Sequence, residues 1–186
     1  MLTKVKGLVR GFARTIKTKL SGQDETCLID CDVDPSIPLG WVIKEHKKGG
    51  RLEINPKDIK AISIASNLRN PGVVIKEFEA FAEKANFTIL NACVLDWYIA
   101  HPEHIPKKGL IMAESIGDGC PFNTVFFLGT SYYTKLGGRV CYRCLRRPCH
   151  SRGKWRESCI IFDENDNDCV VTANYQAAVL QHHSRR

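Results

Sequence analysis

Long apolar runs are missing from this chain of 186 residues. No stretch of about 18 consecutive apolar residues occurs, so the sequence offers no helix that could cross a membrane. The start of the chain also lacks the uninterrupted apolar segment of a secretory signal, and we therefore expect a cytoplasmic protein. Familiar catalytic motifs are missing too: there is no glycine-rich phosphate loop, nucleophile elbow or pair of zinc-binding histidines on a helix.

Acidic residues are missing from two segments that are rich in lysine and arginine. Residues 1–22 carry six basic residues and no acid, which accounts for most of the net charge of +7. Residues 135–156 carry eight basic residues, again with no acid. This uneven charge predicts an anionic partner, and nucleic acid is the partner we expect.

The first basic segment has the pattern of an amphipathic helix. Its apolar residues recur at helical spacing, and the basic residues take the remaining positions. Three interpretations are open: a helix docked on its own domain, a helix that binds anionic lipid or nucleic acid, and an organelle presequence.

Cysteine is abundant and odd in number, with nine residues. Without a secretory signal, this favours free thiols in a reducing compartment and no disulfide framework. A zinc site is the alternative, because two cysteines separated by two residues supply half of a tetrahedral ligand set. On an extended strand, however, Cys141 and Cys144 point to opposite faces, so we expect no cofactor. The zinc candidates are Cys141, Cys144, Cys149 and His150.

One helix is strongly indicated, over residues 88–102. Leu90, Leu95 and Ile99 recur at helical spacing, and Pro102 ends the pattern because it cannot continue a helix. Thr88 is a suitable cap for its first turn. Asp96 is expected to face solvent or to cap a turn and not to perform chemistry, since carboxylates are mostly exposed.

The rest of the chain predicts an α+β fold of mixed short strands and helices, followed by an antiparallel β-meander. Residues 1–22 form the basic amphipathic helix, residues 23–106 an α/β part around the central helix, and residues 107–186 the meander part. The last two parts are expected to form one compact unit. Within the meander, turn signals predict four strands, over 125–133, 139–145, 155–162 and 169–172. A short helix over 175–182 closes the chain.

Several short motifs resemble those of a group of short uncharacterised bacterial proteins. They are IDCDVDP at 29–35, IPLGW at 37–41, EHKKGG at 45–50, LNACVLD at 90–96, AHPEHIP at 100–106 and FFLGT at 126–130. The resemblance implies a bacterial origin and a shared domain shape, and it implies no activity.

The function expected from these patterns is non-enzymatic binding of nucleic acid or another anionic partner. Aromatic side chains among the basic ones would stack on bases while the cations contact phosphates. The candidate contacts are Arg143, Arg146, Arg147, Arg152, Lys154, Trp155, Arg156, Lys4, Lys6, Arg10 and Arg14. A protein-interaction or structural module is one alternative. The other is a metal-dependent phosphodiesterase-like enzyme, in which Asp30, Asp32 and Asp34 hold the ion and His46 transfers a proton.

Overall fold

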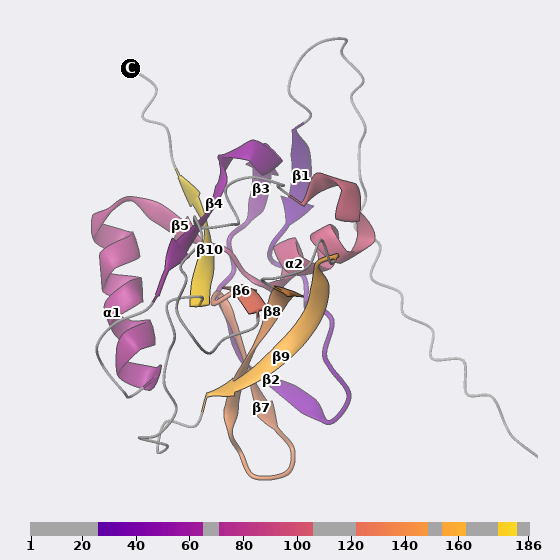
Figure 1. Cartoon of the computed structure of the whole chain (residues 1–186), viewed down its shortest axis with the longest axis vertical. Helices are drawn as coiled ribbons and strands as arrows, with labels where there is room; N and C mark the ends of the chain where they lie inside the picture. The colour runs from indigo at the N-terminus through magenta and orange to yellow at the C-terminus, as the bar shows by residue number, and fades with distance from the viewer. Residues whose placement is uncertain (1–25, 65–70, 106–121, 149–153, 163–174, 182–186) are drawn as a thin grey trace, which may run out of the picture.

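The computed structural model describes residues 26–64, 71–105, 122–148, 154–162 and 175–181 (Figure 1). Within these ranges the chain forms ten β-strands but only two α-helices, so the protein is mainly β. The expected balanced α+β fold is therefore wrong. The expected basic helix over 1–22 lies outside the described residues.

One sheet of eight strands dominates the fold and curls into half of a barrel. Its main path runs, in hydrogen-bonded order, through β2 (Trp41–His46), β7 (Thr130–Thr134), β8 (Val140–Pro148), β6 (Phe122–Phe126), β10 (Tyr175–Gln181) and β4 (Ile59–Ser63). Two further strands lie off this path: β5 (Phe87–Ile89) pairs with β10, and β9 (Arg156–Phe162) pairs with β8. A separate two-stranded sheet joins β1 (Cys27–Asp30) and β3 (Arg51–Ile54). Short 3-10 turns occupy Pro56–Asp58 and Pro102–His104.

β7, β8 and β9 form an antiparallel part, as the turn signals predict. The single strand expected over 125–133 is instead two strands, β6 and β7, and the fourth expected strand, over 169–172, lies outside the described residues. β6 and β7 follow each other along one edge of β8, and β9 runs back along the other edge. The turn into β8 is made by Gly137 and Gly138, whose φ angles of +101° and +62° suit glycine better than other residues.

The expected closing helix over 175–182 is wrong, because this segment is the strand β10, which lies inside the sheet between β6 and β4. Ala177, Ala178 and Val179 are fully buried, so apolar side chains cover both faces of the strand. A short apolar run of this kind does not distinguish a buried strand from a buried helix by its periodicity. β10 runs parallel to β6 and antiparallel to β4, which makes the sheet mixed.

The central helix is shorter than expected at its start. α2 spans Ala92–Ala100, and its cap is Asn91, whose side chain accepts a hydrogen bond from the backbone N–H of Cys93. Thr88 lies instead in β5, opposite Leu180 of β10. The end of the helix lies where the sequence predicts it, because His101 is the C-cap of α2 and Pro102 follows.

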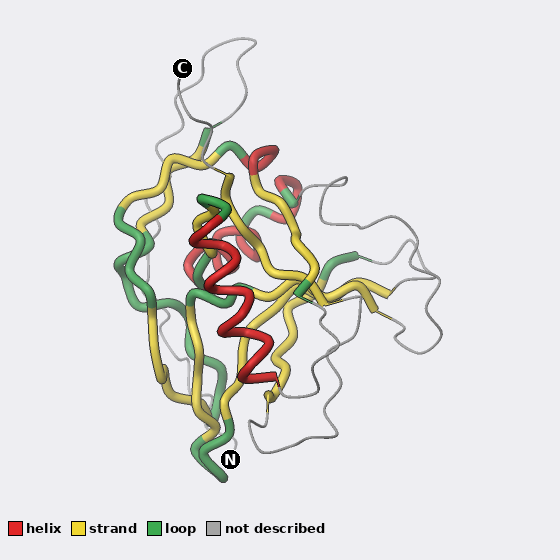
Figure 2. The backbone as a smooth tube through the Cα atoms, turned by 90° about the vertical axis from the view of Figure 1, so that its left-hand side faces the viewer, coloured by secondary structure: helices red, strands yellow, loops and turns green. Residues whose placement is uncertain are grey.

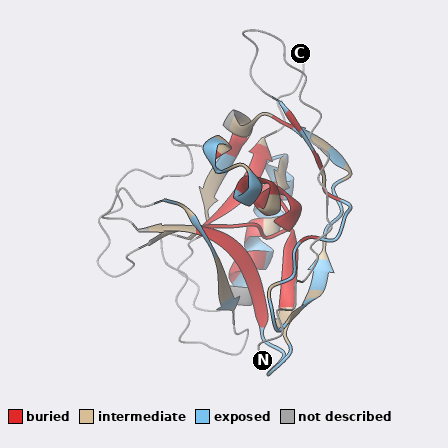
Figure 3. Ribbon diagram, turned by 90° about the vertical axis from the view of Figure 1, so that its right-hand side faces the viewer, coloured by how far each residue is buried: buried red, intermediate tan, exposed pale blue. Residues whose placement is uncertain are grey.

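Both faces of the large sheet are covered. α2 and the small sheet pack on one face, where Leu95 and Tyr98 share a core with Phe127 and Leu145. α1 (Pro71–Lys84) packs on the other face through residues such as Val74 and Phe78. Figure 2 shows α1 lying across the strands, and Figure 3 shows buried residues in the central strands and in α2.

The two parts expected on either side of residue 107 share one sheet. β2 from the first part pairs with β7 from the second, and β4 and β5 pair with β10 near the end of the chain. The described strands of both parts therefore depend on each other for their hydrogen bonds.

Candidate functional site

Arg143 on β8 is buried, with 1% of its surface exposed. Its guanidinium donates to Asp96 Oδ1 at 2.6 Å, to Glu157 Oε1 at 2.7 Å and to the Ser36 carbonyl at 2.9 Å. Burial lowers the pKa of Arg143, but the hydrogen bond and charge of Asp96 outweigh that effect and raise it overall. The guanidinium therefore stays charged and ties α2, β9 and the segment before β2 to β8.

Arg143 was expected at a binding surface, but its guanidinium faces the core. Asp96 was expected to face solvent or to cap a turn. Its side chain is 27% exposed, binds Arg143 and also accepts the backbone N–H of Ser36 at 2.7 Å. Cys141 and Leu145 share the face of Arg143 and are both buried, but Tyr142 and Cys144 on the opposite face are buried too. Alternation along β8 therefore does not single out Arg143, whose burial depends on the partners that the fold supplies.

The other described candidates gather where β8 ends and β9 begins. We name Arg146, Arg147, Lys154, Trp155 and Arg156 the basic end. Within the basic end, the guanidinium of Arg147 lies over the ring of Trp155, with Cζ 5.3 Å from the ring centroid. Lys154 and Arg156 are exposed, and Trp155 is partly buried against the core. The register of the two strands places Arg156 opposite Arg146.

Carboxylates are scarce near the basic end. Glu157 is the only acidic residue between positions 119 and 162 of the sequence. Its carboxylate accepts the Nε–H of Arg143 at 2.7 Å and so already binds a cation. An anion that approaches the basic end therefore meets little repulsion from this part of the sequence.

Some of the sequence-predicted site residues lie outside the described part of the chain. They are Lys4, Lys6, Arg10, Arg14, Cys149, His150 and Arg152.

Cys141 and Cys144 lie on opposite faces of β8, in separate apolar clusters. The Cys141 thiol donates to the Tyr132 carbonyl at 3.5 Å, and the Cys144 thiol donates to the Ser158 carbonyl at 3.4 Å. Burial raises the pKa of both thiols, that of Cys141 to about 12. Their separation follows from the odd spacing on a strand and prevents both from binding one ion.

Asp30 and Asp32, considered above as ligands of a metal ion, accept hydrogen bonds from backbone N–H groups. Asp30 Oδ1 accepts the N–H of Asp32 at 3.1 Å, and Asp32 Oδ1 accepts the N–H of Gly50 at 2.9 Å. Within the described ranges, no group of three His, Cys, Asp or Glu side chains could hold a metal ion. The fold thus does not bring Asp30, Asp32 and Asp34 together with His46 as a metal centre.

His46 and Cys93 approach each other as a base and a nucleophile would, with Nε2 3.9 Å from Sγ. Their atoms are bound elsewhere, however. The Cys93 thiol donates to the Val33 carbonyl at 3.2 Å, and His46 Nε2 lies 3.0 Å from the Cys31 carbonyl. Burial, followed by the nearby Cys31 and Asp96, raises the pKa of Cys93 to about 12. A reactive thiol needs a lowered pKa, so we assign Cys93 a structural role.

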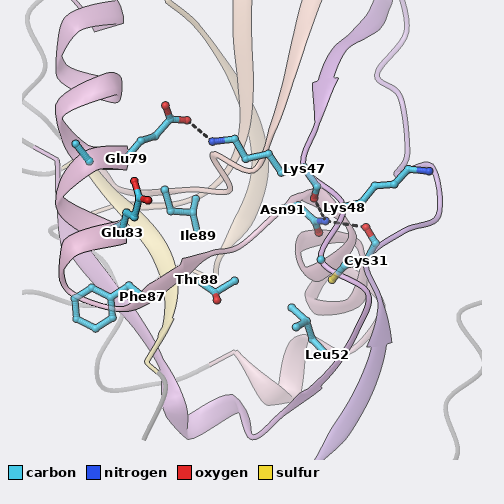
Figure 4. A pocket seen from close by; sticks show the side chains of 13 residues that line it. Cys31, Lys47, Lys48, Leu52, Glu79, Glu83, Phe87, Thr88, Ile89 and Asn91 are labelled. Atoms are coloured by element: carbon cyan, nitrogen blue, oxygen red, sulfur yellow. Dashed lines mark hydrogen bonds and ion pairs between the residues drawn. The ribbon is translucent and has the colours of Figure 1, made fainter. Parts of the chain in front are cut away.

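A pocket of about 550 Å³ opens between α1, β5 and the segment after β2 (Figure 4). Lys47 Nζ and Glu79 Oε1 form an ion pair at 2.6 Å across it, with Glu83 one helical turn farther along α1. The Asn91 amide donates to the carbonyls of Cys31 and Lys47, both at 3.0 Å. No motif marks this pocket, because its lining comes from segments that only folding brings together. Its apolar lining is Leu52, Ala80, Ala82, Phe87 and Ile89.

Comparisons of the chain with protein-family models, curated proteins and solved structures found no match. Any function assigned to the candidate site must therefore be argued from the positions of its own residues. The resemblance to short bacterial proteins stays a prediction and assigns no role to any of these side chains.

Proposed function

We propose that this protein is a non-enzymatic binding protein whose basic end holds a single-stranded nucleic acid. The observation that carries the proposal is the guanidinium of Arg147 over the ring of Trp155, at 5.3 Å. A flat cation of this kind offers its outer face to a base and its charge to a phosphate. The Nε of Arg147 is buried and finds no hydrogen-bond partner among the described residues, so contact with the ring is what positions the group.

The exposed cations beside this pair support the same partner. Lys154 and Arg156 flank Trp155 in sequence and are both exposed. Backbone phosphates follow one another along a strand, so cations on both sides of a stacking platform suit a chain of nucleotides better than an isolated anion. Arg143 takes no direct part in this proposal and acts only by supporting β8.

An acidic protein is the alternative partner for the same charges. Its carboxylates would pair with Lys154, Arg156 and the guanidinium of Arg147, but it would gain little from the aromatic ring of Trp155. The contribution of stacking therefore distinguishes the two partners.

The test measures binding of a labelled single-stranded oligonucleotide of about 12 nucleotides by fluorescence anisotropy. Trp155→Ala and Arg147→Ala should each weaken binding by about 5- to 100-fold, because a stacked base contributes about 1 to 3 kcal/mol. The matched control, Lys76→Ala, removes an exposed charge from α1 and should change the affinity less than about twofold. Failure of the wild type to bind at low salt would contradict the proposal. The proposal would also be contradicted if polyglutamate bound as tightly as the oligonucleotide and the Trp155→Ala variant kept that binding.

A further inference from the structure

Two leucines project from the end of the molecule that lies opposite the basic end. Leu39, in the turn before β2, has a relative exposure of 102%, and Leu136, in the turn between β7 and β8, has 93%. A single exposed leucine is ordinary on a protein surface, so these two indicate a binding surface only if the residues around them support one.

The two turns form one surface. The backbone N–H of Lys135 donates to the Gly40 carbonyl at 2.9 Å, which holds the turns side by side. Ile37, two residues before Leu39 and just outside its turn, is 51% exposed and adds a third exposed apolar side chain to this segment. We name Ile37, Leu39 and Leu136 the apolar tip. Both turns lie at the lower end of the sheet in Figure 1, and Figure 3 shows exposed residues at the same end.

Aromatic rings lie directly behind the apolar tip. Trp41, the first residue of β2, is partly exposed, and its ring centroid lies 6.0 Å from that of Tyr132. Tyr133, also partly exposed, lies under Lys44, whose Nζ is 5.0 Å from the ring centroid. Tryptophan and tyrosine with partial exposure are the residues that favour the boundary between hydrocarbon and lipid headgroups.

Cations surround these rings. Lys44, Lys135 and Arg139 are exposed, and the sequence contains no acid over 35–44 or over 119–156. Lys135 and Arg139 flank Leu136 in the turn between β7 and β8, so this end of the molecule combines apolar side chains, aromatic rings and positive charge. A protein that lies on an anionic bilayer combines the same three kinds of residue.

We propose that the apolar tip docks on an anionic lipid surface, with Leu39 and Leu136 among the acyl chains and Lys135 and Arg139 at the headgroups. No helix in the described part of the chain is long and apolar enough to cross a membrane. Two narrow turns fit a deformable bilayer better than a protein partner, because a stable protein complex covers about 800 Å² on each side.

The test is co-sedimentation of the full chain with vesicles of phosphatidylcholine and phosphatidylserine, compared with phosphatidylcholine alone. The double variant Leu39→Ser/Leu136→Ser should lower the partition coefficient at least about tenfold, because burying one leucine contributes about 1.5 to 3 kcal/mol and 1.4 kcal/mol is tenfold. Lys135→Ala should weaken binding about fivefold, and only on vesicles that contain phosphatidylserine. The matched control, Leu28→Ser/Ile99→Ser, changes side chains that are 41% and 42% exposed elsewhere and should keep wild-type binding.

Lipids brominated on the acyl chain give a second measurement. They should quench the fluorescence of Trp41, and Trp41→Phe should remove the quenched component. Residues 1–22 contain no tryptophan, so quenching does not report on that segment. Vesicle binding unaffected by the double leucine substitution, or lack of quenching of Trp41, would overturn the proposal. A tip substitution that abolishes self-association and leaves vesicle binding unchanged would instead identify a second copy of the chain as the occupant.

Discussion

Arg143 and Asp96 are joined at 2.6 Å, and this ion pair connects the central strand β8 to the helix α2. The arginine side chain is 2% exposed and the aspartate side chain 27%. β8 carries the basic end where it finishes, and the turn with Leu136 where it starts. The buried pair thus holds in place the strand on which both proposed surfaces depend.

Asp96→Ala should destabilise the protein by about 3 kcal/mol, because removal of one partner leaves a buried charge poorly compensated. Arg143 would keep Glu157, which places the effect toward the lower end of the range for buried pairs. Urea unfolding followed by circular dichroism measures the change. Asp34→Ala is the control, since Asp34 is exposed, and it should change the free energy of unfolding by less than about 0.5 kcal/mol. Equal changes in the free energy of unfolding for the two variants would show that the Arg143–Asp96 ion pair does not stabilise the fold.

Leu95→Ala should lower the free energy of unfolding by about 2 to 5 kcal/mol, because it leaves a cavity under α2. Leu95 is fully buried between the helix and the sheet. Ile99→Ala, on the same helix but 42% exposed, should have a smaller effect. A tolerated Leu95→Ala would be incompatible with the described orientation of α2.

Gly129→Ala should destabilise the protein by about 1 to 3 kcal/mol through overpacking. A Cβ atom at this position would lie 2.9 Å from Cβ of Asn91 and 3.0 Å from its backbone nitrogen. Asn91 caps α2, so the clash would disturb the start of the helix. Thermal unfolding measures the effect. Gly137→Ala serves as a comparison, because the strain there comes from the φ angle of +101° and leaves α2 untouched.

Alkaline pH should destabilise the folded chain through its buried thiols. Burial raises the pKa of Cys93 from 9.0 to about 12, and that of Cys27 from 9.0 to about 11. Above about pH 9 the unfolded chain therefore binds fewer protons than the folded chain, and the free energy of unfolding falls as pH rises. The stabilising effect of each protonated thiol is complete below about pH 9 and is lost progressively as pH rises through the folded pKa.

Urea unfolding at pH 8 and pH 10 checks this expectation. The loss of stability between these values should be smaller in Cys93→Ala than in the wild type by about 1 kcal/mol, since one pKa unit corresponds to 1.36 kcal/mol. An identical loss in both proteins would mean that Cys93 ionises equally in the folded and unfolded states.

The parts of the fold that depend on local chemistry could be predicted from the sequence. Pro102 ends α2, and the glycines before β8 make its turn, because proline and glycine act on the backbone wherever they occur. The start of α2 could not be predicted, because residues 87–89 pair with β10 from the far end of the chain. β10 itself was expected to be helical, because its buried state comes from neighbours on both edges and both faces.

In the candidate site, too, local sequence predicts some features and contacts between distant segments decide the others. Charge counts find the basic segment, but they do not show which arginine turns inward. That choice depends on Asp96, which is 47 residues away in sequence and meets Arg143 only in the folded protein. Strand alternation places Arg143 with Cys141 and Leu145, but it places Arg147 on the same face, so the local pattern does not identify the buried arginine.

The salt dependence of oligonucleotide binding tests the proposed function most directly. In the wild type, the logarithm of the affinity should fall with the logarithm of salt concentration, by about 0.7 for each phosphate contacted on a single strand. Lys154→Ala/Arg156→Ala should reduce this slope by about 1.4, whereas Trp155→Ala should lower the affinity and leave the slope unchanged. A slope unaffected by the loss of both cations would contradict binding of nucleic acid at the basic end.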